Sequence, residues 1–140
     1  MKRKKITLGV QRLALMKKYP NGICTCKFNQ LNWVGKLRPT ALSREYNIKV
    51  RYTGRGLPSV LLYGKNLLGF GRKDLPHHFD CYRKEGVDYI PLCLCQWWEF
   101  DSNKLLSDTI MPWILEWLYQ YEIWLATGQW NGGGHTFSQN

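Results

Sequence analysis

The residues with the most evident chemical potential are two cysteines separated by one residue, Cys93 and Cys95. They end a short apolar run that begins near Val87, and Trp97 and Trp98 follow them directly. A thiol can act as a nucleophile, as a metal ligand or as a small buried side chain. Because these thiols end an apolar strand-like run beside an aromatic stretch, we look for the chemistry of the chain here.

The number and spacing of the cysteines bear on which of these three roles the thiols have. The other three are Cys24, Cys26 and Cys81, and the odd total of five argues against a disulfide framework. Cys24-Thr-Cys26 and Cys93-Leu-Cys95 could supply four thiolates to zinc, but structural zinc sites usually separate paired cysteines by two to four residues. We therefore expect neither a metal nor a cofactor, and Cys81 has no partner in the sequence pattern.

Polar residues on both sides of the thiols are candidates for support. His77 and His78 could donate to an oxyanion or deprotonate a nucleophile, although a loop histidine pair is as often structural. Glu99 and Asp101, in the polar connector after the cysteines, could orient or deprotonate an attacking amine, or could simply be solvated.

The strongest element is a helix over residues 109–127. Apolar residues recur there at the i, i+3, i+4, i+7 spacing of one helical face. Asp108 or Thr109 can cap the start, Pro112 fits the first turn, and Gly128 is a natural residue just past the end. The expected face comprises Ile110, Trp113, Ile114, Trp117, Leu118, Tyr121, Trp124 and Leu125.

The earlier part of the chain predicts one short helix and an antiparallel meander. The helix spans residues 7–19, and its expected apolar face comprises Ile6, Val10, Leu13 and Met16 or Lys17. We predict an α+β fold with the helices on one side of the sheet. The expected β segments are 23–37 (two strands with a turn near 30–32), 47–53, 58–63 and 87–94, with a turn over 82–88.

Charge is divided unevenly along the chain. Residues 1–72 carry 16 Lys/Arg and one acid, a net +15, whereas residues 73–140 carry 4 Lys/Arg and 9 acids, a net −5. The asymmetry favours an acidic or nucleic-acid partner for the first half, or else a solvated basic face that complements the second half. One hypothesis is therefore a nucleic-acid-binding module that uses Trp33 and Tyr52.

Length and composition predict a single domain over residues 1–140, with a basic arm at 1–5 and a glycine-rich tail at 129–140. No run of 18 uncharged apolar residues occurs, so we expect no membrane span and a cytoplasmic protein. For Gly132–Gly134 we expect a flexible tail or a loop folded back toward the thiols. A phosphate loop is disfavoured because the Lys-Ser/Thr ending is missing.

The order of elements resembles the ubiquitin-conjugating-enzyme fold. The counterparts of its motifs are Leu57-Pro58, Leu75-Pro76-His77-His78, Leu92-Cys93-Leu94, Trp97 or Trp98, and Thr109-Ile110. More specifically, several strings are similar to a divergent prokaryotic branch found in short CBASS antiphage operons. Those strings are Trp33-Val-Gly-Lys-Leu-Arg-Pro39-Thr40, Leu92-Cys-Leu-Cys95, Asp108-Thr-Ile-Met-Pro-Trp113, Glu116-Trp-Leu-Tyr-Gln-Tyr-Glu-Ile-Trp-Leu-Ala-Thr-Gly128 and Trp130-Asn-Gly-Gly133.

This resemblance implies a transferase in which Cys93 is the nucleophile and carries a thioester. The implied partner is a cGAS-like nucleotidyltransferase, whose C-terminus would be the acyl group, and another protein must supply activation. Cys95 could replace or assist Cys93. The sulfur is expected to be exposed and ionisable at the mouth of a groove walled by tryptophan.

Two departures from that family's pattern concern the site. No asparagine follows the His-Pro-like turn, so Asn103 could stand in as the amide donor. The longer spacing between His77 and Cys93 implies an inserted hairpin around residues 81–86. A catalytically inactive adaptor of the same fold remains an alternative, and Tyr119 and Ile123 on the flank of the long helix raise the possibility of a homodimer.

Overall fold

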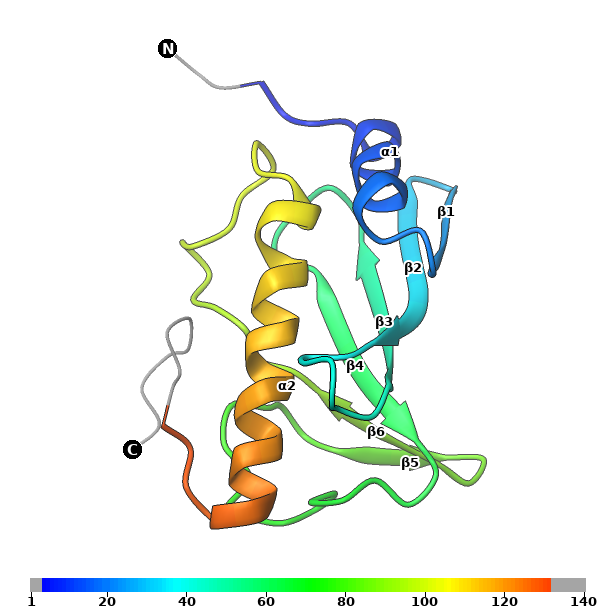
Figure 1. Cartoon of the computed structure of the whole chain (residues 1–140). Helices are drawn as coiled ribbons and strands as arrows, with labels where there is room; N and C mark the ends of the chain where they lie inside the picture. Colours follow the sequence, from blue (N-terminus) through cyan, green and yellow to red (C-terminus); the bar gives the residue numbers. More distant parts are fainter. Residues whose placement is uncertain (1–3, 132–140) are drawn as a thin grey trace.

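The computed structural model describes residues 4–131 and forms an α+β fold. A six-stranded antiparallel sheet has the order β1-β2-β3-β4-β6-β5, and α2 runs across it (Figure 1). The expected basic arm lies partly, and the glycine-rich tail mostly, outside the described residues. The elements are α1 (Leu8–Lys18), β1 (Ile23–Lys27), β2 (Gln30–Leu37), β3 (Tyr46–Tyr52), β4 (Ser59–Gly64), β5 (Tyr82–Lys84), β6 (Val87–Pro91), the 3-10 helix η1 (Leu106–Asp108) and α2 (Ile110–Thr127).

Two hairpins are closed by two-residue turns. Phe28 and Asn29 join β1 to β2 with φ of 53° and 58°, and Glu85 and Gly86 join β5 to β6 with φ of 53° and 78°. Positive φ at both central residues is the geometry that matches the twist of hairpin strands. The hairpin expected around residues 81–86 is confirmed, but the turn expected over 82–88 is limited to Glu85 and Gly86, because 82–84 form β5 and β6 begins at Val87. The turn expected near residues 30–32 is wrong, because those residues belong to β2 and an exposed phenylalanine takes the turn position instead.

One face of the sheet forms the core. Ile48, Val50 and Tyr52 on β3 are buried, as their alternation predicted. Trp33 is also buried at 1% exposure, and a Cβ on Gly22 would stand only 2.3 Å from its ring. Trp33 and Tyr52 therefore cannot be the aromatic contacts of a nucleic-acid surface, which corrects that part of the hypothesis.

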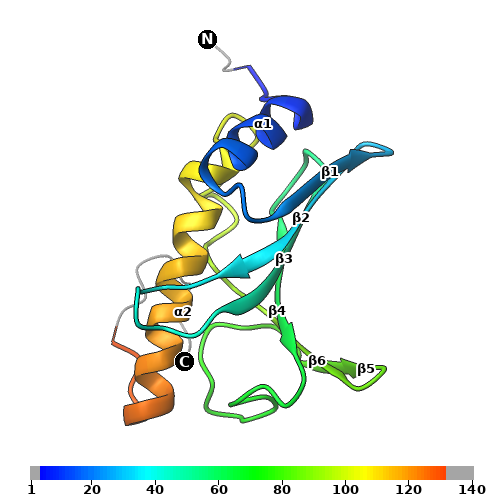
Figure 2. The ribbon, with the colours of Figure 1, turned by 45° about the vertical axis from the view of Figure 1, so that its right-hand side comes forward.

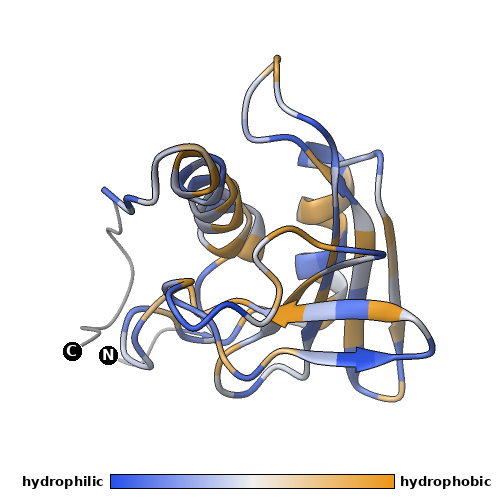
Figure 3. Cartoon of the chain, turned by 90° about the horizontal axis from the view of Figure 1, so that it is seen from below, coloured by the Kyte–Doolittle hydropathy of each residue, from blue (hydrophilic) through white to orange (hydrophobic). Residues whose placement is uncertain are grey.

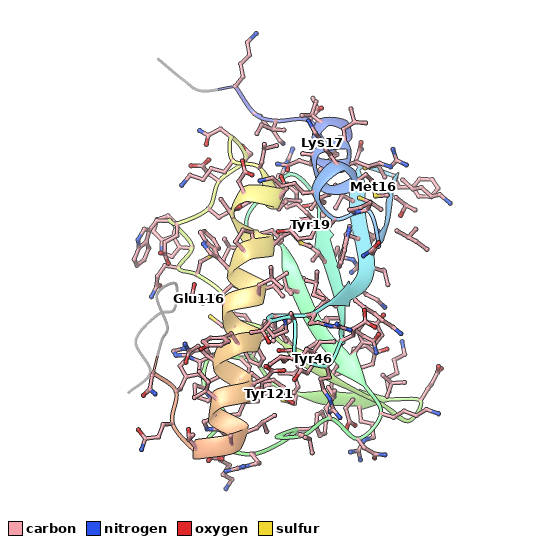
Figure 4. All side chains as sticks on the ribbon, in the orientation of Figure 1. Met16, Lys17, Tyr19, Tyr46, Glu116 and Tyr121 are labelled. Carbon is pink, nitrogen blue, oxygen red and sulfur yellow. The ribbon has the colours of Figure 1, made fainter. Side chains whose placement is uncertain are left out.

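The helix α2 covers this inner face. In Figure 3, where α2 is seen close to end-on, the helix lies beside the sheet. Tyr121 of α2 meets Tyr46 of β3 edge-to-face at 5.9 Å between ring centroids (Figure 4). The predicted face is largely confirmed, although Trp113 and Leu125 are only partly buried and Met111 takes a fully buried place.

The C-terminal end of α2 is capped as predicted, whereas the N-terminal end is not. Gly128 ends the helix with φ of 78°, and its amide donates to the carbonyl of Trp124 at 2.8 Å. At the start, Thr109 occupies the cap position but its hydroxyl makes no capping bond. It donates instead to the carbonyl oxygen of Leu105 at 2.8 Å.

The helix α1 has its expected span but buries a different face. Val10 and Leu13 are 48% and 66% exposed, whereas Gln11 and Leu15 are fully buried. The buried amide of Gln11 is satisfied on both sides: its Nε2 donates to the carbonyl of Lys104, and its Oε1 accepts from the amide of Leu106, each at 2.8 Å. A polar residue thus faces inward because it fastens α1 to the segment before α2.

Both helices lie on the same side of the sheet, as predicted (Figure 2). Across residues 4–131 the opposite side of the sheet is covered by neither helix. None of the helices in this part of the chain is long and apolar enough to cross a membrane.

Candidate functional site

Cys93 lies just beyond the end of β6, where the chain is still held in a sheet-like arrangement. Leu92 pairs with His78 as an isolated bridge, and its amide donates to the carbonyl of Val60 at 2.9 Å. The amide of Cys93 then donates to the carbonyl of His77 at 3.0 Å. Segments 77–79 and 91–93 therefore run side by side and fix the backbone of Cys93.

His77 contributes through its backbone. Its φ of 56° is in the left-handed region, which is unusual for a residue other than glycine. Its carbonyl oxygen accepts hydrogen bonds from the amide of Cys93 and from the indole Nε1 of Trp117, the latter at 2.9 Å. Its ring packs against Trp130 at 5.4 Å, and burial, followed by the neighbouring His78, lowers the pKa of the imidazole.

The side chain of His78 contacts Phe79 and Cys81 and not Cys93. Its Nδ1 lies 2.6 Å from the carbonyl oxygen of Phe79 and 3.7 Å from the sulfur of Cys81. The structure thus places His78 with Cys81, and brings His77 to Cys93 through the main chain.

A cavity of about 300 Å³ opens beside the two thiols. Two of its apolar lining residues, Leu57 and Phe79, are 39% and 55% exposed and form its rim. Because most of the lining is apolar, the cavity suits an apolar group. The lining includes Leu57, Val60, Phe79, Cys93, Cys95 and Ile110.

The state of the thiols differs from the expectation. Cys93 is 2% exposed and Cys95 is 6% exposed, and burial raises the pKa of each thiol to about 11. The negative charge of Glu99 raises the pKa of Cys95 further. The expectation of an exposed, ionisable sulfur is therefore wrong for this conformation, because apolar cavity walls disfavour the thiolate.

The tryptophans next to the thiols do not wall the cavity. Trp97 and Trp98 are 75% and 60% exposed and meet edge-to-face at 5.5 Å. They project from the connector, so the expected tryptophan-lined groove is replaced by aliphatic residues, Phe79 and the two cysteines.

The polar residues of the connector hold its shape. The carboxylate of Glu99 accepts the amide of Gln96 at 2.6 Å, and that of Asp101 accepts the amide of Asn103 at 3.1 Å. The side-chain oxygen of Asn103 is buried without a partner in the described part of the chain. Of these residues, Glu99 is the one whose negative charge raises the pKa of a thiol in the site, that of Cys95.

The remaining cysteines lie apart from the cavity in the sheet order. Cys24 and Cys26 are on β1, and three strands separate β1 from β6. Cys24 is buried, and Cys26 donates weakly to the carbonyl of Leu8 at 3.6 Å. Among residues 4–131, no group of three or more His, Cys, Asp or Glu residues could hold a metal ion.

Sequence reasoning missed several residues that build the site. Phe79 belongs to no motif in the sequence, and the helical periodicity marks Ile110 as a core residue and not as part of a cavity wall. The hydrogen bond from Trp117 to His77 spans 40 positions and leaves no local pattern.

Comparison with known proteins identifies the family. The family model described as Type II CBASS E2 protein matches residues 11–137, which is nearly the whole chain. No curated protein matches the chain. The helix order and the six-stranded antiparallel sheet are consistent with an E2-like fold, and the match implies an E2-like role in CBASS antiphage systems. The chain belongs to the family of type II CBASS E2 proteins.

Proposed function

We propose that the chain is a cysteine-dependent conjugating transferase in which Cys93 carries an acyl group as a thioester. The acyl group would be the C-terminal carboxyl of a cGAS-like nucleotidyltransferase. The observation that carries this proposal is that the backbone-anchored Cys93 lines the apolar cavity at the end of β6, in a chain of the E2 family.

The chemistry takes two steps. An activated acyl group, delivered by another protein as a mixed anhydride or a thioester, is attacked at its carbonyl carbon by the sulfur of Cys93. The new C–S bond forms as the bond to the phosphate or thiolate leaving group breaks, and the thiol proton passes to water. An amine then attacks the same carbon, a C–N bond forms, and the sulfur departs and regains a proton. Neither step requires a metal or an organic cofactor.

Burial of the thiol adds a condition to this chemistry. At neutral pH Cys93 is a protonated thiol because its pKa is about 11. Once the acyl donor has entered at the rim made by Leu57 and Phe79, attack therefore requires that the thiol lose its proton as the C–S bond forms. We assign to Glu99, whose charge reaches Cys95, the role of orienting the incoming amine.

A second candidate is an inactive adaptor of the same fold. The observation that favours it is the 2% exposure of Cys93 together with its raised pKa. In that case the chain would bind the nucleotidyltransferase without forming a covalent adduct.

Co-expression with the nucleotidyltransferase and the other proteins encoded beside it separates the two. The transferase predicts an adduct band on a non-reducing gel that thiols remove, that Cys93→Ala abolishes, and that Cys93→Ser converts into a thiol-resistant but alkali-sensitive ester. The matched control is Cys26→Ala, which removes an exposed thiol on β1 and should leave the band intact. Co-purification without any adduct, unchanged in Cys93→Ala, would establish the adaptor.

A further inference from the structure

The helices leave one face of the sheet uncovered (Figure 2), and the strand residues that point to this face include several cations. Residues on each strand alternate between the buried face and this one, so the outward set follows from the burial pattern. No carboxylate occupies an outward strand position among the described residues. The cations at these positions are Lys27, Lys36, Lys49, Arg51 and Lys84.

The same face is hollowed by a cavity of about 730 Å³. Its lining combines three cations, two aliphatic residues, two tyrosines and three small polar residues. They are Lys49, Arg51, Lys84, Val34, Leu61, Tyr82, Tyr89, Thr25, Asn32 and Ser59. Pairing across the sheet brings Val34, Lys49 and Leu61 into one row. Lys49 therefore lies between two apolar side chains, and this mixture of cations and apolar surface suits a ligand that carries both negative charges and flat apolar groups.

A column of tyrosine rings borders the hollow. Tyr63 on β4 stacks on Tyr89 of β6 at 5.9 Å and 20°, and Tyr89 stacks on Tyr82 of β5 at 4.9 Å and 9°. Lys49 lies over the ring of Tyr63 at 5.2 Å. Tyr82 is at the edge strand and is 43% exposed, and none of the ring contacts within residues 4–131 covers its far face. A nucleobase stacked there would extend the column by one ring.

We propose that this face, independently of the transferase chemistry, binds single-stranded nucleic acid. Phosphates contact Lys49, Arg51 and Lys84, and bases cover Val34 and Leu61 and stack on Tyr82. A single strand fits better than a duplex, since a duplex keeps its base faces stacked inside and would set phosphates against Val34 and Leu61. Lys27, Lys36, Lys49 and Arg51 belong to residues 1–72, so part of the net +15 charge of that segment lies on this face.

The test measures fluorescence anisotropy of the full chain with labelled dT₁₂ and U₁₂. Three phosphate contacts on a single strand predict a slope of about −2 in log K against log salt, so affinity should fall about 16-fold between 50 and 200 mM salt. Lys49→Glu/Arg51→Glu should weaken binding at least tenfold. The matched control is Lys4→Glu/Lys17→Glu, which changes net charge equally at exposed positions away from the sheet and should change affinity less than threefold.

A second pair of variants tests base stacking. Tyr82→Ala should weaken binding about tenfold, whereas Tyr119→Ala on α2, where exposure is a similar 46%, should have no effect. Circular dichroism spectra confirm that each variant is folded. Cys93→Ala should bind as tightly as the unaltered chain, which separates this proposal from the transferase.

Four results would overturn the proposal. They are absence of binding at 50 mM salt, equal losses in the two charge-reversal pairs, a 12-base-pair duplex bound as tightly as dT₁₂, and a glutamate 12-mer that competes as well as dT₁₂. The last result would indicate an acidic protein surface as the ligand. Comparison of dT₁₂ with U₁₂ shows whether DNA or RNA is preferred.

Discussion

The carbonyl oxygen of His77 and the indole nitrogen of Trp117 form a 2.9 Å hydrogen bond that joins α2 to the backbone anchor of Cys93. The same oxygen accepts the amide of Cys93. A single acceptor atom therefore connects the backbone of the candidate nucleophile to the helix. Substitution of Trp117 on α2 should change how readily the segment around the thiol opens.

Trp117→Phe should loosen the segment around Cys93. The substitution leaves a carbonyl with one donor fewer, and a loss of about 1 kcal/mol would increase local opening about fivefold. The measurement is the alkylation rate of Cys93 by iodoacetamide, read by mass spectrometry. The control is Trp124→Phe, which alters an equally buried indole on the same helix beside Gly69 and Arg72. Equal acceleration in both variants would contradict a specific role for the shared carbonyl.

The pH dependence of alkylation tests the state of the thiol. Burial raises the pKa of Cys93 from 9.0 to about 11, so the thiolate fraction at pH 7.5 is about a hundredfold lower than for an ordinary cysteine. We expect Cys93 to react about tenfold faster for each unit from pH 8 to pH 10. The exposed Cys26 should react first at pH 7.5. A rate for Cys93 that levels off below pH 8 would show that its thiol is activated in the free chain.

Gly69 should be sensitive to substitution for a reason that Gly71 does not share. Both have positive φ, 79° and 76°, but a Cβ on Gly69 would lie 2.9 Å from the ring of Trp124, whereas a Cβ on Gly71 meets nothing within 4 Å. Gly71→Ala should cost about 1–2 kcal/mol through backbone strain alone. Gly69→Ala should cost about 1–3 kcal/mol more through overpacking. Urea unfolding measures both, and equal losses would show that Trp124 moves aside freely.

Asp88 should support the fold in a defined pH range. The hydrogen bond from Arg83, at 2.6 Å, lowers the pKa of this carboxyl below its usual 3.8, and the amide of Leu67 assists. Its contribution is therefore complete above about pH 4 and is lost as pH falls through the lowered folded-state pKa. Asp88→Asn should reduce stability at pH 7 and flatten the decline of the urea midpoint below pH 4. An unchanged acid decline in this variant would assign it to other carboxyls.

Elements with a local sequence pattern could be predicted, whereas contacts between residues far apart in the sequence could not. Periodicity predicted α2, because eighteen helical residues repeat one apolar face, and alternation predicted β3. The cavity beside Cys93 could not be predicted, since its lining brings together Leu57, Phe79 and Ile110, which are far apart in the sequence. The face of α1 was misjudged because Gln11 reads as polar, and only its partners Lys104 and Leu106 make it a buried residue.

The order of the strands determines which part of the fold can form while the chain is still being synthesised. Strands β1 to β4 pair with their neighbours in sequence, so this meander can form as soon as the chain up to Gly64 has emerged from the ribosome. The helix that covers its apolar side is made last. In the interval Ile48, Val50 and Leu62 face water, and a nascent chain stalled before residue 110 would be a natural client for chaperones.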